Sequence, residues 1–66
     1  MQIYDFVEWE LDMLRAECNF SDEELEYFNL RAKHKSNIEI SLVMNMSESK
    51  VSKLAKRVKA KIYKIL

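Results

Sequence analysis

Hydrophobic residues recur along this chain at steps of three and four, which is the spacing of residues on one face of an α-helix. The first such series predicts a helix from about residue 3 to residue 18. Its apolar positions are Ile3, Phe6, Val7, Leu11, Leu14 and Cys18. Trp9 and Met13 lie four residues apart and form a second apolar strip on the same helix. We expect both strips to lie in the core, with an interface between subunits as the alternative for the second.

Serine residues mark the beginnings of three further helices. Ser21 is followed three residues later by Glu24, and Ser36 by Glu39. Both pairs match the capping box, in which each side chain accepts a backbone N–H of the other residue. We therefore expect a second helix from about residue 22 and a third over residues 37–44. Ser47 is expected to cap a long fourth helix from residue 48 toward residue 66.

The second and fourth helices each carry an apolar face. On the second helix, the residues expected to be buried are Leu25, Tyr27, Phe28, Leu30 and Ala32. On the fourth helix, they are Val51, Leu54, Ala55, Val58, Ile62 and Ile65. The remaining positions of the fourth helix are mostly Lys, Arg and Ser, so its other face is expected to be polar and basic.

The 66 residues include no glycine and no proline. Tight hairpin turns favour those residues, so a β-sandwich or barrel is disfavoured and a single all-α domain of four helices is expected. A glycine loop that cradles phosphate is excluded. The helices must also be joined without glycine. We expect left-handed backbone at Asn19, His34–Lys35 and Asn45, because Asn tolerates it best after glycine.

Residues 37–54 fit a helix-turn-helix unit, in which a three-residue turn joins two helices that cross steeply. With Asn37 as position one, such a unit needs apolar residues at positions four, eight, ten, fifteen and eighteen. The residues at these positions are Ile40, Met44, Met46, Val51 and Leu54. Position five must be small, and position nine must accept a positive φ. Ser41 and Asn45 meet these two requirements.

The net charge of zero conceals two oppositely charged halves. Residues 1–30 contain nine acidic residues and one basic residue, for a net charge of −8. Residues 31–66 contain ten basic residues and two acidic residues, for a net charge of +8. This asymmetry suggests a polyanionic partner for the basic half. The alternative is that the halves only attract each other, although exposed ion pairs contribute under about 1 kcal/mol each.

Three stretches carry a resemblance to known DNA-binding domains: SDEELE at residues 21–26, SNIEI at residues 36–40 and MSESKVS at residues 46–52. Over about residues 20–66, the chain resembles the C-terminal, promoter-reading domain of bacterial sigma factors and the LuxR-type DNA-binding domain. The additional helix ahead of Phe20 makes it more similar to the sigma domain. The chain departs from the pattern of these families at three positions, which are His34, Ser41 and Asn45.

The resemblance implies that the helix of residues 48–66 enters the major groove of double-stranded DNA and reads base edges with its N-terminal residues. The residues expected to contact bases are Glu48, Ser49, Lys50, Ser52 and Lys53. The residues expected to contact phosphates are Lys33, Lys35, Ser36, Asn37, Ser47, Lys56, Arg57, Lys59 and Lys61. The acidic residues of the first helix are expected to form a solvated face that points away from DNA. The alternative is that they contact a basic protein.

Other classes of function find no support in the sequence. With one His, one Cys and no nucleophile or metal-binding motif, the chain is not expected to be an enzyme or to use a metal, a cofactor or a small-molecule substrate. The single Cys18 cannot form an internal disulfide. We expect neither a signal peptide nor a membrane span, which favours a protein of the bacterial cytoplasm.

The sequence therefore predicts a stand-alone transcriptional regulator from a bacterium, a phage or a mobile element, because 66 residues cannot hold the other sigma domains. One such module makes few base contacts, so a homodimer is expected. The candidate interface residues are Phe6, Trp9, Met13, Tyr63, Ile65 and Leu66. One alternative is a module that docks on RNA polymerase or a sigma factor without touching DNA. Another is a structural dimer with no nucleic-acid role.

Overall fold

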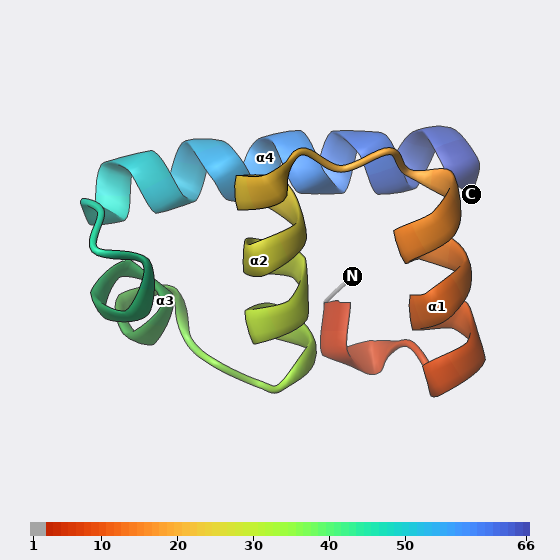
Figure 1. Ribbon diagram of the computed structural model, residues 1–66, viewed down its shortest axis with the longest axis horizontal. Helices are drawn as coiled ribbons and strands as arrows, with labels where there is room; N and C mark the ends of the chain where they lie inside the picture. Colours follow the sequence, from red (N-terminus) through yellow and green to blue (C-terminus); the bar gives the residue numbers. More distant parts are fainter. Residues whose placement is uncertain (1–2) are drawn as a thin grey trace.

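The computed structural model describes residues 3–66, and Figure 1 shows that this part of the chain is built from helices. A 3-10 turn at Ile3–Asp5 comes first. Four α-helices follow, which are α1 (Glu8–Glu17), α2 (Asp22–Ala32), α3 (Asn37–Met44) and α4 (Glu48–Ile65). No strand occurs within residues 3–66, so the prediction of an all-α, four-helix fold is confirmed.

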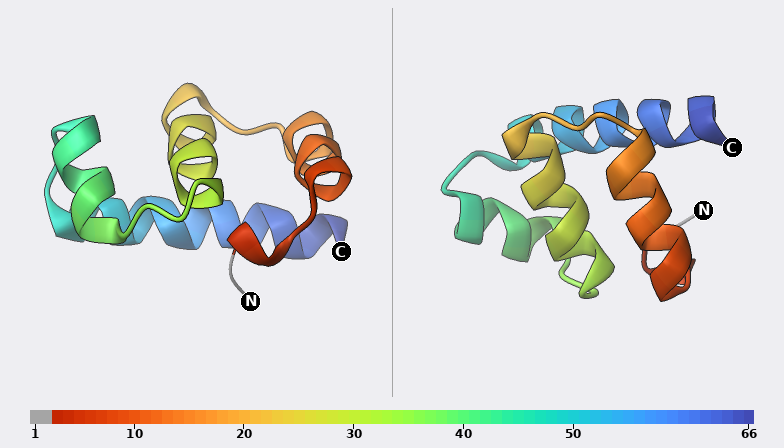
Figure 2. Two further views of the ribbon diagram at one scale, coloured as in Figure 1. Left: turned by 90° about the horizontal axis from the view of Figure 1, so that it is seen from below. Right: turned by 45° about the vertical axis from the view of Figure 1, so that its right-hand side comes forward.

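The long helix α4 supports the three shorter helices. α3 packs at the N-terminal end of α4, α2 crosses its middle, and α1 lies toward its C-terminal end (Figure 1 and Figure 2). One buried cluster joins all four helices, and its fully buried members include Leu14, Phe28, Ile40, Val51, Val58 and Ile62. Burying side chains of this size contributes about 1.5–3 kcal/mol each, so packing stabilises α4 along most of its length.

The serine caps form as predicted. Ser21 Oγ accepts the N–H of Glu24 at 3.3 Å, while the Glu24 carboxylate accepts the N–H of Ser21 at 2.9 Å. Ser36 and Glu39 make the same reciprocal pair at 3.2 Å and 3.1 Å. Ser47 Oγ accepts an N–H of the first turn of α4 at 3.1 Å. These bonds satisfy amides that have no partner within their helix, and they define where α2, α3 and α4 begin.

Three residues at the ends of helices adopt the left-handed backbone, as predicted for a chain without glycine. They are Asn19, His34 and Asn45, with φ values of 52°, 67° and 54°. Asn and His enter this region more readily than most residues that carry a side chain. The ring of His34 also stacks on the ring of Tyr4, with centroids 4.5 Å apart. This contact ties the end of α2 to the N-terminal 3-10 turn.

The prediction of one helix over residues 3–18 is wrong in its N-terminal part. The extended residue Val7 (φ −80°, ψ 167°) separates the 3-10 turn from α1. The Glu10 carboxylate accepts the N–H of Val7 at 3.0 Å and so caps the start of α1. The break leaves Ile3 buried on the side of α2, whereas Val7 is exposed. A continuous helix would keep Ile3 and Val7 on one face and could not separate them in this way.

The core assignment of Trp9 is also wrong, because 69% of its surface is exposed. Met13 and Phe6 are half-buried and pack against the core cluster. Ile65 is 40% exposed, so its predicted place in the core is also wrong; it lies near the end of α1, beside Glu17 and Cys18. The other predicted core positions of α4 are buried. Cys18 is buried as expected, and desolvation raises the pKa of its thiol.

Candidate nucleic-acid interface

The turn between α3 and α4 has the geometry that the sequence predicts. Asn45 and Met46 both donate their backbone N–H to the carbonyl oxygen of Ser41, the second at 3.0 Å. Ser41 is buried, and its hydroxyl donates to the carbonyl oxygen of Ile38 at 2.7 Å. The five apolar positions of the unit are buried or packed against the core; they are Ile40, Met44, Met46, Val51 and Leu54. A small residue at position 41 and a left-handed residue at position 45 thus hold α3 against the start of α4.

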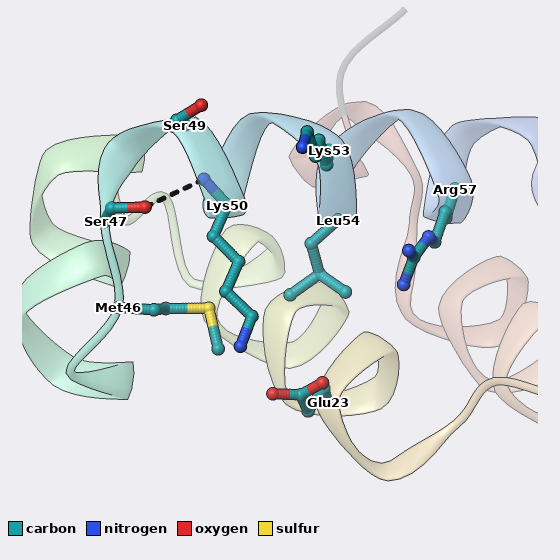
Figure 3. A pocket seen from close by; sticks show the side chains of 8 residues that line it. All are labelled: Glu23, Met46, Ser47, Ser49, Lys50, Lys53, Leu54 and Arg57. Atoms are coloured by element: carbon teal, nitrogen blue, oxygen red, sulfur yellow. Dashed lines mark hydrogen bonds between the residues drawn. The ribbon is translucent and has the colours of Figure 1, made fainter.

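The first turns of α4 present polar side chains to solvent. The five residues expected to contact bases are all exposed, namely Glu48, Ser49, Lys50, Ser52 and Lys53. Ser49 and Lys53 lie one turn apart, and the Ser49 hydroxyl points away from α2 in Figure 3. Lys50 instead leaves the side of α4 and extends toward α2. The structure therefore brings these five residues to the N-terminal end of α4, but the side chains of Ser49 and Lys50 point in different directions.

A groove of about 390 Å³ lies between the first turns of α4 and the beginning of α2 (Figure 3). Met46 and Leu54 supply its apolar lining, and Lys50 and Arg57 project from α4 toward the α2 residue Glu23. Sequence reasoning missed Glu23 as a residue of this site. Acidic residues are common in the first turn of a helix, where the helix dipole favours them, and no local signal shows that Glu23 lies beside α4.

Cationic side chains follow both edges of α4. One edge carries Lys50, Lys53 and Arg57 at spacings of three and four residues. The other edge carries the cations Lys56 and Lys59, three residues apart, and the neutral Ser52 one turn before Lys56. Of these side chains, only that of Lys59 is partly buried. The exposed face of α4 is therefore bounded by positive charge on both sides.

The predicted phosphate contacts around α3 already have partners within the protein. Ser36 and Ser47 cap their own helices, as described above. The Asn37 side-chain oxygen accepts a hydrogen bond from the Tyr27 hydroxyl at 3.3 Å. The ammonium of Lys35 lies 3.9 Å from the Glu39 carboxylate. Lys33, by contrast, is simply exposed at the end of α2. These groups lie at the same end of the molecule as the turn before α4 but are less available than the lysines of α4.

Lys61 lies in a different environment from the one that the sequence predicts. Its ammonium pairs with the Glu24 carboxylate and donates to the carbonyl oxygen of Asn19 at 3.1 Å. The Glu24 side chain is only 6% exposed, and the hydrogen bond from Lys61 holds the pKa of that carboxyl below its usual range. A phosphate contact would draw Lys61 away from this buried carboxylate. We therefore assign Lys61 to the framework and not to the DNA-facing set.

The acidic residues occupy two different places. Those of α1 include Glu8, Asp12 and Glu17, which are exposed on the helix packed toward the C-terminal end of α4. They lie far from the first turns of α4 (Figure 1). Glu23 of α2, in contrast, lines the groove beside those turns. The acidic residues of α1, for which the sequence predicts a solvated face away from DNA, thus belong to a helix far from the first turns of α4, whereas Glu23 of α2 lies beside those turns.

The candidate residues for a dimer interface differ in how far they are exposed. Trp9, Tyr63 and Leu66 are exposed by 69%, 60% and 65%. Phe6 and Met13 are half-buried within the same chain. Sequence reasoning missed a further apolar surface on α3, whose exposed residues are Ile38, Leu42 and Val43. Its signal in the sequence is the large share of apolar residues on α3, and that signal is equally compatible with a fully buried helix.

Among residues 3–66, no three His, Cys, Asp or Glu side chains are grouped closely enough to hold a metal ion. No helix in that range combines the length and hydrophobicity needed to cross a membrane. Comparisons with models of protein families, with curated proteins and with solved structures find no match to this chain.

Proposed function

We propose that this protein binds double-stranded DNA in a sequence-specific manner and acts as a stand-alone transcriptional regulator. The observation that carries the proposal is the exposed face at the start of α4. Ser49 points outward from a helix that a short turn fixes against α3, and exposed cations, among them Lys53 and Lys56, lie on either side of it along α4. A helix of this kind reads base edges in the major groove while its flanking cations contact the two phosphate backbones.

The dimensions of α4 suit this role. Its 18 residues span about 27 Å, which is longer than the roughly 12 Å width of the major groove. Only part of the helix can therefore lie in the groove, and the N-terminal turns are the part that α1 and α2 leave open. Lys donates well to guanine and Ser to several base edges, so Ser49, Ser52 and Lys53 can discriminate bases. Lys56 and Arg57, one turn further on, are suited to phosphates.

We further propose that two copies act together on a two-fold site. The exposed base-reading set at the start of α4 consists of five residues, too few for a long recognition site. Dimers of helix-turn-helix domains solve this problem by placing one helix in each of two neighbouring major grooves.

A second candidate function is docking on a protein such as RNA polymerase or a sigma factor without contact to DNA. It is favoured by the exposed carboxylates of α1 together with the exposed Trp9, which would suit a basic protein surface with an apolar pocket. Under this alternative, the lysines at the start of α4 would be solubilising residues and their loss would leave the main interaction unchanged.

A salt titration separates the two functions. The affinity for duplex DNA of mixed sequence is measured by fluorescence anisotropy over a series of salt concentrations. A DNA-binding protein should show a log–log slope of about −0.9 for each phosphate contact. The Lys50→Glu, Lys53→Glu double variant should lose most of the affinity. No salt-dependent binding by the wild type at low ionic strength would contradict the proposal.

The single variants Lys53→Glu and Lys64→Glu make a matched comparison, because both residues are exposed lysines of α4 and the charge change is equal. They lie eleven residues apart, or about 16 Å along the helix axis. Lys53→Glu should weaken binding strongly and Lys64→Glu only slightly. Equal effects would indicate unspecific attraction to the whole basic half. Recovery of polymerase subunits by both variants, without DNA binding, would favour the second function.

A further inference from the structure

Helix α3 exposes an apolar face that no part of the described chain covers. Ile38 is 61% exposed, Leu42 76% and Val43 58%. Ile38 and Leu42 are four residues apart and lie on the side of α3 opposite the buried Ile40. Leu42 is the most exposed of the large hydrophobic side chains within residues 3–66. We refer to Ile38, Leu42 and Val43 as the α3 patch.

The α3 patch is unusual for a surface helix. Such a helix normally carries polar residues on its outward face, and adjacent exposed apolar side chains mark a site of association. Ile38 and Leu42 lie one turn apart on the same face of α3, and the exposed Val43 follows Leu42 at the edge of that face. The α3 patch belongs to a helix that packs beside the N-terminal end of α4 (Figure 2).

The charges around the α3 patch are compensated. Glu39 is the only charged residue of α3. Its carboxylate accepts the N–H of Ser36, which together with the Ser36 hydroxyl holds the pKa of Glu39 below its usual range. The Lys35 ammonium lies 3.9 Å from the same carboxylate. The patch therefore presents apolar side chains with no net charge beside them.

Two other exposed apolar residues, Trp9 and Tyr63, have charges mainly of one sign near them in the sequence, although Asp12 beside Trp9 pairs with Arg15 at 2.8 Å. Trp9 lies between Glu8 and Glu10 in the sequence, with the exposed Asp12 one turn away. Tyr63 lies next to Lys64 and one turn from Lys59. In a two-fold dimer, each patch meets the same patch of the other copy. A contact through Trp9 would bring carboxylates together, and a contact through Tyr63 would bring ammonium groups together.

We infer that a second copy of this chain covers the α3 patch, so that α3 packs against α3 across a two-fold axis. This rests on the self-association proposed above and names the surface that forms it. The argument for a second copy is that two α3 patches can meet without bringing like charges together. A strongly charged partner, in contrast, would find no opposite charge beside the patch. The Ile38–Leu42 ridge is of the type that packs between the ridges of another helix at a steep angle.

The size of the α3 patch sets the strength of the contact. An eight-residue helix offers less than the roughly 800 Å² per partner of a stable interface, so we expect a dissociation constant on the order of 100 μM. α3 lies at the end of α4 that carries the base-reading residues (Figure 1). Pairing through α3 would therefore bring the N-terminal ends of two α4 helices toward the same axis.

Sedimentation equilibrium of the full chain without DNA tests the inference. Leu42→Lys places a charge in the α3 patch, and Leu66→Lys makes the same change at a residue of similar exposure at the other end of α4. We expect dimerisation of the wild type to be weakened at least tenfold by Leu42→Lys and to be unchanged by Leu66→Lys. Circular dichroism should show the same helix content in all three proteins, because both positions are exposed.

Three results would overturn the inference. The first is a wild type that stays monomeric at about ten times the expected dissociation constant, and the second is a Leu42→Lys variant that dimerises as well as the wild type. The third is dimerisation that high salt abolishes, because apolar pairing persists in salt whereas pairing of an acidic with a basic surface does not. Loss of the dimer in Leu66→Lys alone would move the interface to the C-terminal end.

Failure of this inference is distinguishable from failure of the DNA-binding proposal. Leu42→Lys retains every lysine of α4, so its salt-dependent binding to short duplex DNA should persist. A wild type that dimerises through α3 but does not bind DNA would leave the inference standing and remove the proposed function. A wild type that stays monomeric but binds DNA with the expected salt dependence would overturn the inference and leave the proposed DNA binding standing.

Discussion

Replacing Glu24 by Gln tests whether its ion pair with Lys61 holds the framework behind the candidate interface together. The pair links the first turn of α2 to the C-terminal half of α4, and Lys61 also bonds to the α1–α2 connection through Asn19. Gln keeps a side-chain oxygen that can accept the N–H of Ser21, so the capping box survives the substitution. The variant therefore removes the charge and little else.

The expected decrease in the free energy of unfolding is about 2 kcal/mol. Removing one partner of a fully buried ion pair costs about 3–5 kcal/mol, because the other charge is left unpaired. The side chain of Lys61 is 34% exposed, so water solvates part of its ammonium and reduces this cost. For a domain of this size, a loss of about 2 kcal/mol lowers the midpoint of thermal unfolding by roughly 8–16 °C.

The effect should depend on pH in a defined direction. The pKa of Glu24 in the folded protein lies below the ordinary value of 4.5, because the carboxylate accepts a hydrogen bond from Lys61. The stabilisation is therefore fully present above pH 4.5 and is lost as the pH falls through the lower, folded-state pKa. The stabilities of the wild type and Glu24→Gln should differ at neutral pH and converge in acid.

Urea unfolding followed by circular dichroism, at neutral pH and at several acidic values, measures both effects. Glu23→Gln is the matched control, since Glu23 is the preceding residue of the same helix but is exposed. It should change the free energy of unfolding by less than about 0.5 kcal/mol. A Glu24→Gln protein as stable as the wild type at neutral pH would refute the reasoning. The reasoning would also be refuted if the difference in free energy of unfolding between the wild type and Glu24→Gln did not decrease at acidic pH.

Two further predictions concern stability. Asn45→Ala should lower the free energy of unfolding by about 1–2 kcal/mol, because alanine is strained at a φ of 54°. Asn45→Gly should be at least as stable as the wild type, because glycine adopts this φ without strain. Thermal unfolding of the two variants checks this, and equal effects on stability would show that the left-handed turn is unimportant. Ile62→Ala should lower the free energy of unfolding by about 2–5 kcal/mol, because Ile62 is fully buried. Ile38→Ala, on the exposed side of α3, should change the free energy of unfolding of the dilute monomer by under about 0.5 kcal/mol. Urea unfolding of both proteins measures this contrast, and similar losses would mean that the core is misassigned.

Local features of the sequence predict most of the fold. The Ser21–Glu24 and Ser36–Glu39 capping boxes act within three residues, so their signal requires no knowledge of the tertiary structure. The same holds for the left-handed residue Asn45, which is required wherever two helices are joined by so short a turn. These features predict the bounds of α3 and the start of α4, and with them the position of the residues that we propose contact bases.

Features that depend on packing between distant segments could not be predicted. The pairing of Glu24 with Lys61 joins residues 37 positions apart. It determines that Lys61, which has the same local pattern as the other lysines of α4, belongs to the framework. The break at Val7 depends on Ile3 finding a buried place beside α2. The exposure of Leu42 depends on how many sides of α3 are covered, which the periodicity of an apolar eight-residue helix does not reveal.

Mapping the amides that respond to DNA tests the central claim most directly. In a nitrogen–proton correlation spectrum of the isotope-labelled protein, titration with duplex DNA should shift the amides of residues 47–53 and those around Ser36. The amides of α1 should remain unchanged, because that helix is packed at the other end of α4. Shifts confined to α1, or no shifts at low ionic strength, would contradict the proposal that the N-terminal turns of α4 lie on DNA.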